Sequence, residues 1–228
     1  MKIAVLGTGM VGRSLSSRLA GLGHDVAIGT RDVDTTLSVA EPDRMGNVPF
    51  AQWQADHPEV RLLTFADAGV HGEVVVNATG GGVSLAALEA AGPDNLAGKV
   101  VIDVANTLDF SQGMPPSLSV VNTDSLGEQL QRAFPDARVV KTLNTMNASV
   151  MVDPSRVPGD HDVFVAGEDA DAKETVKGLL REFGWKDDNI VDLGGIRAAR
   201  GAEMYVSLWL SLWGAFGTPD YNIKVVRA

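Results

Sequence analysis

The chain has 228 residues, of which 45% are hydrophobic and 21% charged, and its formal net charge is −10. This size fits one large domain, or one domain with a short extension. The acidic balance disfavours a nucleic-acid partner, because phosphate binding needs a surplus of Lys and Arg. The absence of cysteine excludes disulfides, Cys-ligated zinc, iron–sulfur clusters and thiol nucleophiles. No apolar run reaches the roughly 18 residues of a membrane span, and the first run is too short for a signal peptide, so we expect a cytoplasmic protein without a membrane partner.

Short apolar runs alternate with helical patterns through the first two thirds of the chain. This alternation predicts a doubly wound parallel sheet of the Rossmann type over residues 1–146, with helices on both faces. Residues 32–57 are irregular, and residues 106–120 are predicted to form a loop or flap over the carboxyl edge of the sheet. The predicted strands are 3–6, 26–28, 61–63, 74–77, 100–104 and 139–143, and the predicted helices are 11–22, 83–91 and 125–134.

Residues 147–228 are predicted to form a small α/β extension that serves for dimerisation and as a lid. Its expected elements are strands at 162–166 and 190–193, a helix at 170–183 and a long helix at about 196–216. Both faces of the long helix are apolar or small, and a helix that is apolar all round is expected to be buried. Its aromatic residues fit equally an intrachain core and a homodimer interface.

The clearest motif is the turn Gly7-Thr8-Gly9-Met10-Val11-Gly12, which follows an apolar strand and opens an amphipathic helix. Gly7 permits a tight turn, Gly9 allows the backbone to approach a pyrophosphate, and Gly12 allows the helix to pack close to the strand. The pyrophosphate then binds the free N–H groups at the positive end of the helix dipole. This context predicts a dinucleotide-binding site.

A second motif, Gly29-Thr30-Arg31-Asp32, ends the second predicted strand. An enzyme that prefers NAD usually places a carboxylate there to accept from the ribose 2′-OH. Arg31 instead can bind a 2′-phosphate through its charge and fork geometry, with Thr30 donating a hydrogen bond. Asp32 suits a helix N-cap better than a ribose contact. The motif therefore favours NADP over NAD.

Three later strand ends carry polar or small residues, which a parallel sheet brings to the same edge. We expect them to line the nicotinamide half of the site. They are Asn77, Ala78 and Thr79 after the fourth strand, Asp103, Ala105 and Asn106 after the fifth, and Asn144 to Ala148 after the sixth.

No general acid or base is evident in the sequence. It has no Tyr-x-x-x-Lys pair and no plausible metal cluster, and His24, His57, His71 and His161 fall where structural or solvated roles are expected. Ketone reduction needs a proton for the alkoxide, whereas hydride transfer between two redox cofactors does not depend on such a residue. The leading hypothesis is hydride transfer between NADPH and a flavin or deazaflavin. Reduction of a small imine or carbonyl and a non-catalytic NADP(H) sensor remain alternatives.

Over nearly its whole length the chain resembles the coenzyme F420-dependent NADP reductase family, and the cytosolic NADPH domain of six-transmembrane ferric reductases shares the same plan. The residues that carry the resemblance are Gly7–Gly12, Leu19, Leu22-Gly23-His24, Gly29-Thr30-Arg31, Lys141-Thr142-Leu143-Asn144-Thr145, Asp162-Val163-Phe164-Val165-Ala166-Gly167, Gly184, Asp192-Leu193-Gly194, Ala198-Ala199-Arg200 and Glu203.

The resemblance implies NADP as cofactor, coenzyme F420 or a flavin as second substrate, and a homodimer formed through the carboxyl-terminal part. It places Thr8, Met10 and Val11 in the pyrophosphate turn and Thr30 and Arg31 at the 2′-phosphate. Ala78, Asn106 and residues 144–148 would flank the nicotinamide. The stretches 32–57 and 107–120 are longer than in a minimal family member. Thr145-Met146-Asn147 does not match the family's deazaflavin contacts, which leaves the acceptor open.

Overall fold

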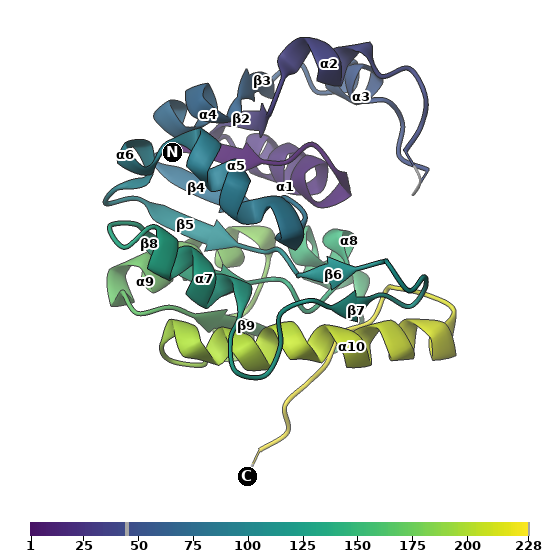
Figure 1. The fold of residues 1–228 in the computed structure, drawn as a ribbon. Helices are drawn as coiled ribbons and strands as arrows, with labels where there is room; N and C mark the ends of the chain where they lie inside the picture. Colours follow the sequence, from purple (N-terminus) through teal and green to yellow (C-terminus); the bar gives the residue numbers. More distant parts are fainter. Residues whose placement is uncertain (44–45, 228) are drawn as a thin grey trace.

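In the computed structural model, which describes residues 1–43 and 46–227, one sheet runs through the molecule with helices on both faces (Figure 1). The sheet has eight strands in the order β10-β9-β8-β5-β4-β1-β2-β3. Their bounds are β1 (Lys2–Leu6), β2 (Asp25–Thr30), β3 (Arg61–Thr64), β4 (Val74–Asn77), β5 (Val100–Asp103), β8 (Arg138–Thr142), β9 (Val163–Ala166) and β10 (Ile190–Asp192).

Six neighbouring strands of the sheet, β8, β5, β4, β1, β2 and β3, are parallel, which confirms the predicted Rossmann sheet. Alternate side chains of β1 enter opposite cores: Ile3 and Val5 join one hydrophobic cluster, and Ala4 and Leu6 join the other. Because both faces are covered, the strand is apolar without interruption. The carboxyl ends of these strands therefore meet at one edge, where the predicted site residues lie.

Helices α1, α8 and α9 pack on one face of the sheet, and α4, α5, α6 and α7 pack on the other. The helices predicted at 11–22, 83–91, 125–134 and 170–183 are confirmed to within a few residues. The bounds of the helices are α1 (Met10–Gly21), α2 (Val33–Ser38), α3 (Phe50–Asp56), α4 (Phe65–His71), α5 (Ser84–Ala91), α6 (Pro93–Leu96), α7 (Leu126–Ala133), α8 (Ala148–Val152), α9 (Ala170–Phe183) and α10 (Ala199–Phe216).

The two stretches that the sequence left irregular contain short elements. The first carries α2 and α3, although its Arg44 and Met45 lie outside the described residues. The second contains an antiparallel pair, β6 (Leu108–Asp109) and β7 (Ser117–Leu118). This hairpin lies beyond the carboxyl edge of the sheet, as expected of a flap (Figure 1).

The carboxyl-terminal extension adds its strands to the same sheet instead of forming a second one. β9 pairs antiparallel with β8, and β10 pairs parallel with β9. α9 then packs on the face that α1 also covers. The division of the chain at residues 146 and 147 stays a prediction.

Helix α10 is confirmed as a long helix, but this single chain buries only one side of its first half. Ala199, Ala202 and Val206 are buried, whereas Leu208 is 55% and Phe216 58% exposed. Little of the chain covers the second half; the ring of Tyr221 stacks on Trp209 there. Among the described residues every helix, α10 included, is too short or insufficiently apolar to cross a bilayer.

Candidate active site

The glycine turn has the conformation that the sequence predicts. Gly7 has a φ of +114°, which L side chains rarely adopt, and a Cβ there would lie 2.6 Å from the carbonyl oxygen of Ala78. A Cβ on Gly12 would lie 1.8 Å from the carbonyl oxygen of Gly7. These two glycines are therefore required for the turn to form and for α1 to start against it.

Gly9 differs from the other two glycines of the turn, because a Cβ there would meet no atom within 4 Å. It is the N-cap of α1, no side chain caps this terminus, and the first turn of the helix holds no acidic residue. The amino end of α1 thus faces open space with its N–H groups and positive dipole end uncompensated. Such a terminus can hold an anion.

At the end of β2, Arg31 is exposed and makes no ion pair with any residue that the structure describes. Asp32 caps α2, its carboxylate accepting from the amide of Thr35 at 2.6 Å, which confirms the N-cap reading. The same bond holds the pKa of Asp32 below its usual value. Among the described residues Arg31 is therefore available to an anion, whereas Asp32 already uses one carboxylate oxygen to cap α2.

The hydroxyl of Thr30 is committed within the protein. The Thr36 hydroxyl donates to the carbonyl oxygen of Asp32 at 2.7 Å, so the Thr30 hydroxyl must be the donor in its 2.7 Å bond to Thr36. Thr30 is also only 8% exposed. Its predicted hydrogen bond to a phosphate stays a prediction, with Arg31 the better placed of the two.

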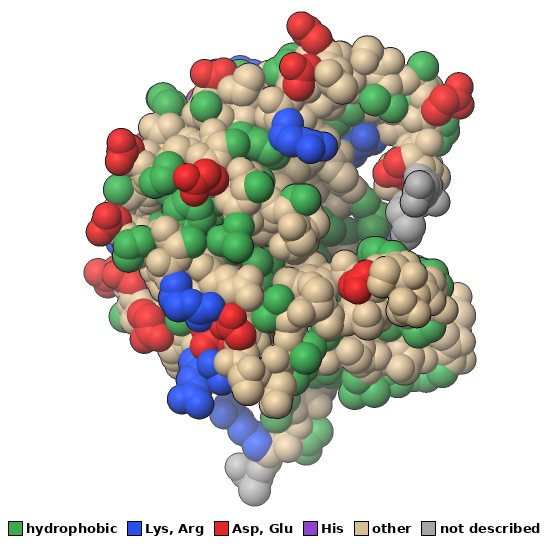
Figure 2. Space-filling model, in the orientation of Figure 1, with side chains coloured by type: hydrophobic (Ala, Val, Ile, Leu, Met, Phe, Trp, Pro, Cys, Tyr) green, Lys and Arg blue, Asp and Glu red, His purple; other side chains and the backbone are tan. Residues whose placement is uncertain are grey.

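Next to the glycine turn, a cavity of about 440 Å³ opens between the carboxyl edge of the sheet, the β6–β7 hairpin and α10. Figure 2 shows the surface hollowed between the segment that carries α2 and α3 and this hairpin, with hydrophobic side chains inside. The lining brings together many predicted site residues. It consists of Met10, Val11, Ala78, Thr79, Gly80, Val104, Ala105, Asn106, Leu108, Phe110, Met114, Pro116, Asn144, Met146, Asn147, Ala148, Met151, Val206, Trp209, Leu210, Trp213 and Pro219.

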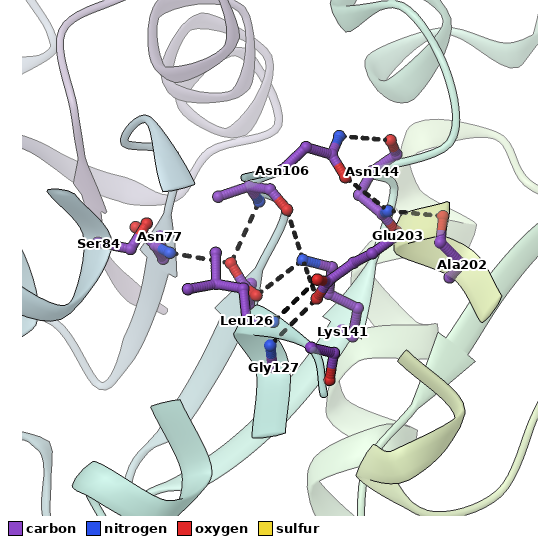
Figure 3. Close-up of polar contacts among 12 residues, drawn as sticks. Asn77, Ser84, Asn106, Leu126, Gly127, Lys141, Asn144, Ala202 and Glu203 are labelled. Atoms are coloured by element: carbon purple, nitrogen blue, oxygen red, sulfur yellow. Dashed lines mark hydrogen bonds and ion pairs between the residues drawn. The ribbon is translucent and has the colours of Figure 1, made fainter. Parts of the chain in front are cut away.

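Two asparagines bind each other at the wall of this cavity (Figure 3). Asn106 donates through Nδ2 to the carbonyl oxygen of Asn144 at 2.8 Å, and Asn144 donates through Nδ2 to Asn106 Oδ1 at 3.0 Å. Asn144 also donates to the carbonyl oxygen of Ala202 in α10, at 3.0 Å. Leu143, which precedes Asn144, has the unusual φ of +62°. The pair therefore fixes two loops and α10 relative to one another.

Asn77 and Asp103, both predicted to line the nicotinamide half of the site, do not reach the cavity. Asn77 and Asp103 are completely buried, and Asn77 Nδ2 donates to Asp103 Oδ1 at 2.8 Å. Asn77 Oδ1 accepts from the Thr79 hydroxyl at 2.7 Å. These side chains lie beneath the strand ends, where buried polar groups must be satisfied internally, and their predicted contact with a cofactor stays a prediction. Their role is to hold the loops that line the cavity.

Sequence reasoning gave no individual role to Lys141 and Glu203, which complete this buried cluster. Lys141 Nζ lies 2.8 Å from Asp103 Oδ2 and 3.0 Å from Glu203 Oε1, and it also donates to the carbonyl oxygen of Ala105. Burial lowers the pKa of Lys141, but the two carboxylates outweigh that effect and raise it above its usual value. The available signal was a lysine at the centre of an apolar strand, which is almost never buried unless it is paired.

Among the residues that the structure describes, the cavity lining contains no Asp, Glu, His, Lys, Arg or Tyr. The histidines make structural contacts, as expected: His24 Nε2 lies 2.7 Å from Glu182, and His161 Nε2 lies 3.0 Å from the carbonyl oxygen of Pro154. Within the described part of the chain, no group of His, Asp and Glu side chains could hold a metal ion. Among its described lining residues the cavity thus offers apolar surface, amide groups and the hydroxyl of Thr79, but no ionisable side chain.

A Rossmann sheet, an uncapped glycine turn and an apolar cavity beside it define a dinucleotide-binding protein. The sequence profile of the family "NADP oxidoreductase coenzyme F420-dependent" matches residues 2–107. The chain is 31% identical to the F420-dependent NADP reductase of Methanothermobacter marburgensis over 218 residues, 93% of this chain and 92% of that protein. It therefore belongs to the coenzyme F420-dependent NADP reductase family and to the NADP-dependent oxidoreductases.

Two further relatives extend this result. The crystal structure of a candidate F420-dependent NADP reductase from Arthrobacter sp. FB24 is 60% identical, with a TM-score of 0.95 over the full length of both chains. Metalloreductase STEAP3 of Rattus norvegicus is 27% identical over 212 residues; these cover 93% of this chain, which spans 38% of that protein. Similarity over both halves of the chain indicates that the carboxyl-terminal extension belongs to the family plan.

Proposed function

We propose that NADP(H) lies along the carboxyl edge of the sheet, with its pyrophosphate at the amino end of α1 and its 2′-phosphate on Arg31. The open space at Gly9 and the guanidinium of Arg31, which has no ion-pair partner among the described residues, support this placement. In a chain of net charge −10, an anion needs such local donors. The nicotinamide end then reaches the cavity at Ala78, Asn106, Asn144 and Ala148.

We further propose that the second substrate is a flavin or a deazaflavin of the coenzyme F420 type. The observation that carries this proposal is the cavity lining, whose described residues are mostly apolar or aromatic and include no ionisable side chain. A carbonyl or imine substrate would need a proton donor at the reacting atom. Two redox rings need mainly to be stacked at close range and kept from water. The bound NADPH supplies the hydride.

The chain's own residues have three tasks in this scheme. The side-chain amides of Asn106 and Asn144 form hydrogen bonds with each other's residue and with α10, so the pair orients the cavity wall. Val206, Trp209 and Trp213 of α10 cover the opposite side with apolar surface. Exclusion of water by these side chains favours hydride transfer over side reactions.

The test is oxidation of NADPH by the purified protein with coenzyme F420, FMN or riboflavin as acceptor. We expect turnover with at least one of them, and none with small ketones or cyclic imines under the same conditions. Turnover only with a ketone or imine would replace the proposed acceptor class. Tight NADPH binding without any turnover, together with an NADPH-dependent change of oligomeric state, would instead support a sensor.

We also propose that a second copy of the chain covers the second half of α10 in a homodimer. Leu208 and Phe216 are both more than half exposed there, and exposed apolar surface of this kind is typical of subunit contacts. Light scattering of the purified protein tests the oligomeric state directly.

A further inference from the structure

In the buried cluster of Asp103, Lys141 and Glu203 behind the cavity, the polar side-chain atoms have hydrogen-bond or ion-pair partners within the protein. Lys141 Nζ has three acceptors, Asp103 Oδ2, Glu203 Oε1 and the carbonyl oxygen of Ala105, one for each hydrogen of an ammonium group. Glu203 Oε2 accepts from the amide of Leu126 at 2.8 Å, and Oε1 accepts from the amide of Gly127 at 3.1 Å. Figure 3 shows Glu203 and Lys141 pointing toward each other.

The hydrogen-bond partners define the charge of each group. Asp103 accepts from Asn77 Nδ2, from the amide of Ala105 and from Lys141, and all of these are donors. Every partner of Glu203 is also a donor. Neither carboxylate has an acceptor to which a proton of its own could be given, so both are ionised and Lys141 is protonated. The cluster thus holds two negative charges and one positive charge.

One negative charge is therefore left in excess in the interior. Glu203 and Lys141 are at most 2% exposed at their side chains, and Asp103 is completely buried. The neighbouring pair of Arg200 and Glu128, bonded at 2.7 Å, adds no net charge. The amino end of α7 contributes only a partial positive charge of about half a unit. Burial keeps water and salt from screening the remainder.

This excess lies directly behind the cavity wall. The amide of Ala105 donates to Asp103 Oδ1 at 3.1 Å, and its carbonyl oxygen accepts from Lys141. Ala105 and the following Asn106 both line the cavity. The third member, Glu203, follows Ala202, whose carbonyl oxygen accepts from Asn144 of the same wall. Asp103 and Lys141 are thus hydrogen-bonded directly to Ala105 of the cavity wall, and Glu203 is linked to the wall through its neighbour Ala202. The nicotinamide is proposed to lie at this wall.

We propose that the excess negative charge of Asp103, Lys141 and Glu203 favours the oxidised, positively charged nicotinamide over its neutral reduced form. This inference rests on the proposed placement of NADP(H). Hydride transfer from NADPH to the proposed flavin or deazaflavin would break a C–H bond of the nicotinamide and leave that ring with a positive charge. The acceptor would take the hydride with its electron pair and become a reduced anion, which a proton from water neutralises. A fixed negative charge behind the wall stabilises that product ring, and it does so without touching it. The three residues are positioning and electrostatic residues, not catalytic ones.

The experiment measures the dissociation constants of NADP⁺ and NADPH separately for four proteins. Glu203→Gln and Asp103→Asn each remove one negative charge, from different elements. The double variant Asp103→Asn/Lys141→Met removes one charge of each sign and keeps the excess at one negative charge. We expect each single variant to weaken NADP⁺ relative to NADPH by about fivefold or more, and the double variant to keep the wild-type ratio within about twofold. Melting temperatures report folding separately.

The ratio separates an electrostatic role from a merely structural one, because loss of packing weakens both cofactor forms together. If one single variant does not fold, the other still tests the charge. An unchanged ratio in a folded single variant overturns the proposal, as does a double variant that shifts the ratio as far as the single ones do. A wild-type protein that binds neither form refutes the proposed function itself, which is a different outcome.

Discussion

Two cationic side chains at the carboxyl edge of the same sheet differ in their exposure and in their ion pairs. Arg31, at the end of β2, is exposed and unpaired among the described residues, next to the uncapped amino end of α1. Lys141, in β8, is fully buried, and each of its ammonium hydrogens has an acceptor. The first arrangement leaves its binding capacity open to a ligand, whereas the second uses all of it to hold protein loops together.

The difference follows from solvent exposure. An exposed guanidinium costs little to leave unpaired, because water solvates it, so it remains available for a phosphate. A buried ammonium without partners would be strongly destabilising, so it occurs only with its partners in place. We call the part of the edge at Arg31 and the glycine turn the open end, and the part at Asp103, Lys141 and Glu203 the closed end. The open end is expected to determine which cofactor binds, and the closed end to determine whether the oxidised or the reduced nicotinamide is favoured.

The largest effect at the open end is expected from Gly12→Ala. The new Cβ would lie 1.8 Å from the backbone oxygen of Gly7, which cannot yield as a flexible side chain can. We expect a loss of about 3 kcal/mol or more in the free energy of unfolding, measured by urea titration, together with loss of NADPH binding.

Gly9→Ala is the matched control within the same turn. Its Cβ enters open space, and the φ of −76° suits any residue, so the free energy of unfolding should stay within about 0.5 kcal/mol of wild type. NADPH binding should nevertheless weaken, because the methyl group occupies the proposed pyrophosphate position. Normal NADPH affinity in this variant would show that the phosphates do not approach the turn.

The next effect is expected from Arg31→Ala. Loss of a guanidinium–phosphate contact should weaken NADPH by roughly 2 kcal/mol or more and leave NADH unchanged, as measured by fluorescence titration. Arg197→Ala is the control, since Arg197 is equally exposed and makes no ion pair with a described residue. Equal losses for the two dinucleotides, or an equal loss in the control, would contradict the 2′-phosphate assignment.

The open end could be predicted from sequence because its signals are local. The glycine spacing, the preceding apolar strand and Arg31 all fall within residues 2–31. The parallel sheet followed from strand and helix alternation. Short helices such as α2 and α3 were missed, because their sequences lack a long amphipathic repeat and depend on tertiary packing.

The closed end could not be predicted in the same way. Asp103, Lys141 and Glu203 are far apart in the chain, and only the pairing of β5 with β8 and the return of α10 bring them together. The sequence therefore placed the strand end of Asp103 correctly but did not predict the buried ion pair that this residue makes with Lys141. For a related reason the sequence left open whether α10 is covered by its own chain or by a second copy, since periodicity shows which residues are apolar but not what covers them.

Helix α10 closes the cavity, and its exposed side is expected to respond to Leu208→Glu. A charge at this 55% exposed position should raise the dimer dissociation constant about tenfold or more, measured by analytical ultracentrifugation. Val70→Glu on α4 is the control, at a position 67% exposed. A wild-type protein that is monomeric, or a dimer insensitive to Leu208→Glu, would move the interface away from this helix.

The smallest effect is expected from Asp124→Asn, just before α7, the helix whose amino end binds the buried Glu203. Arg132 donates to the carboxylate at 2.8 Å and, against the opposing effect of burial, lowers the pKa of Asp124 to about 2 from the usual 3.8. Because the folded-state pKa is depressed, the pair stabilises the protein above pH 4 and loses that effect as the pH falls toward 2.

Arg132 is 60% exposed, so screening limits the contribution to about 1 kcal/mol or less at pH 7. Urea titrations should therefore show wild type slightly more stable than Asp124→Asn at pH 7, and the difference should shrink below pH 4 and vanish only below pH 2. A difference that stays constant over this whole range would mean that the hydrogen bonds to Asp124, and not its charge, stabilise the start of α7.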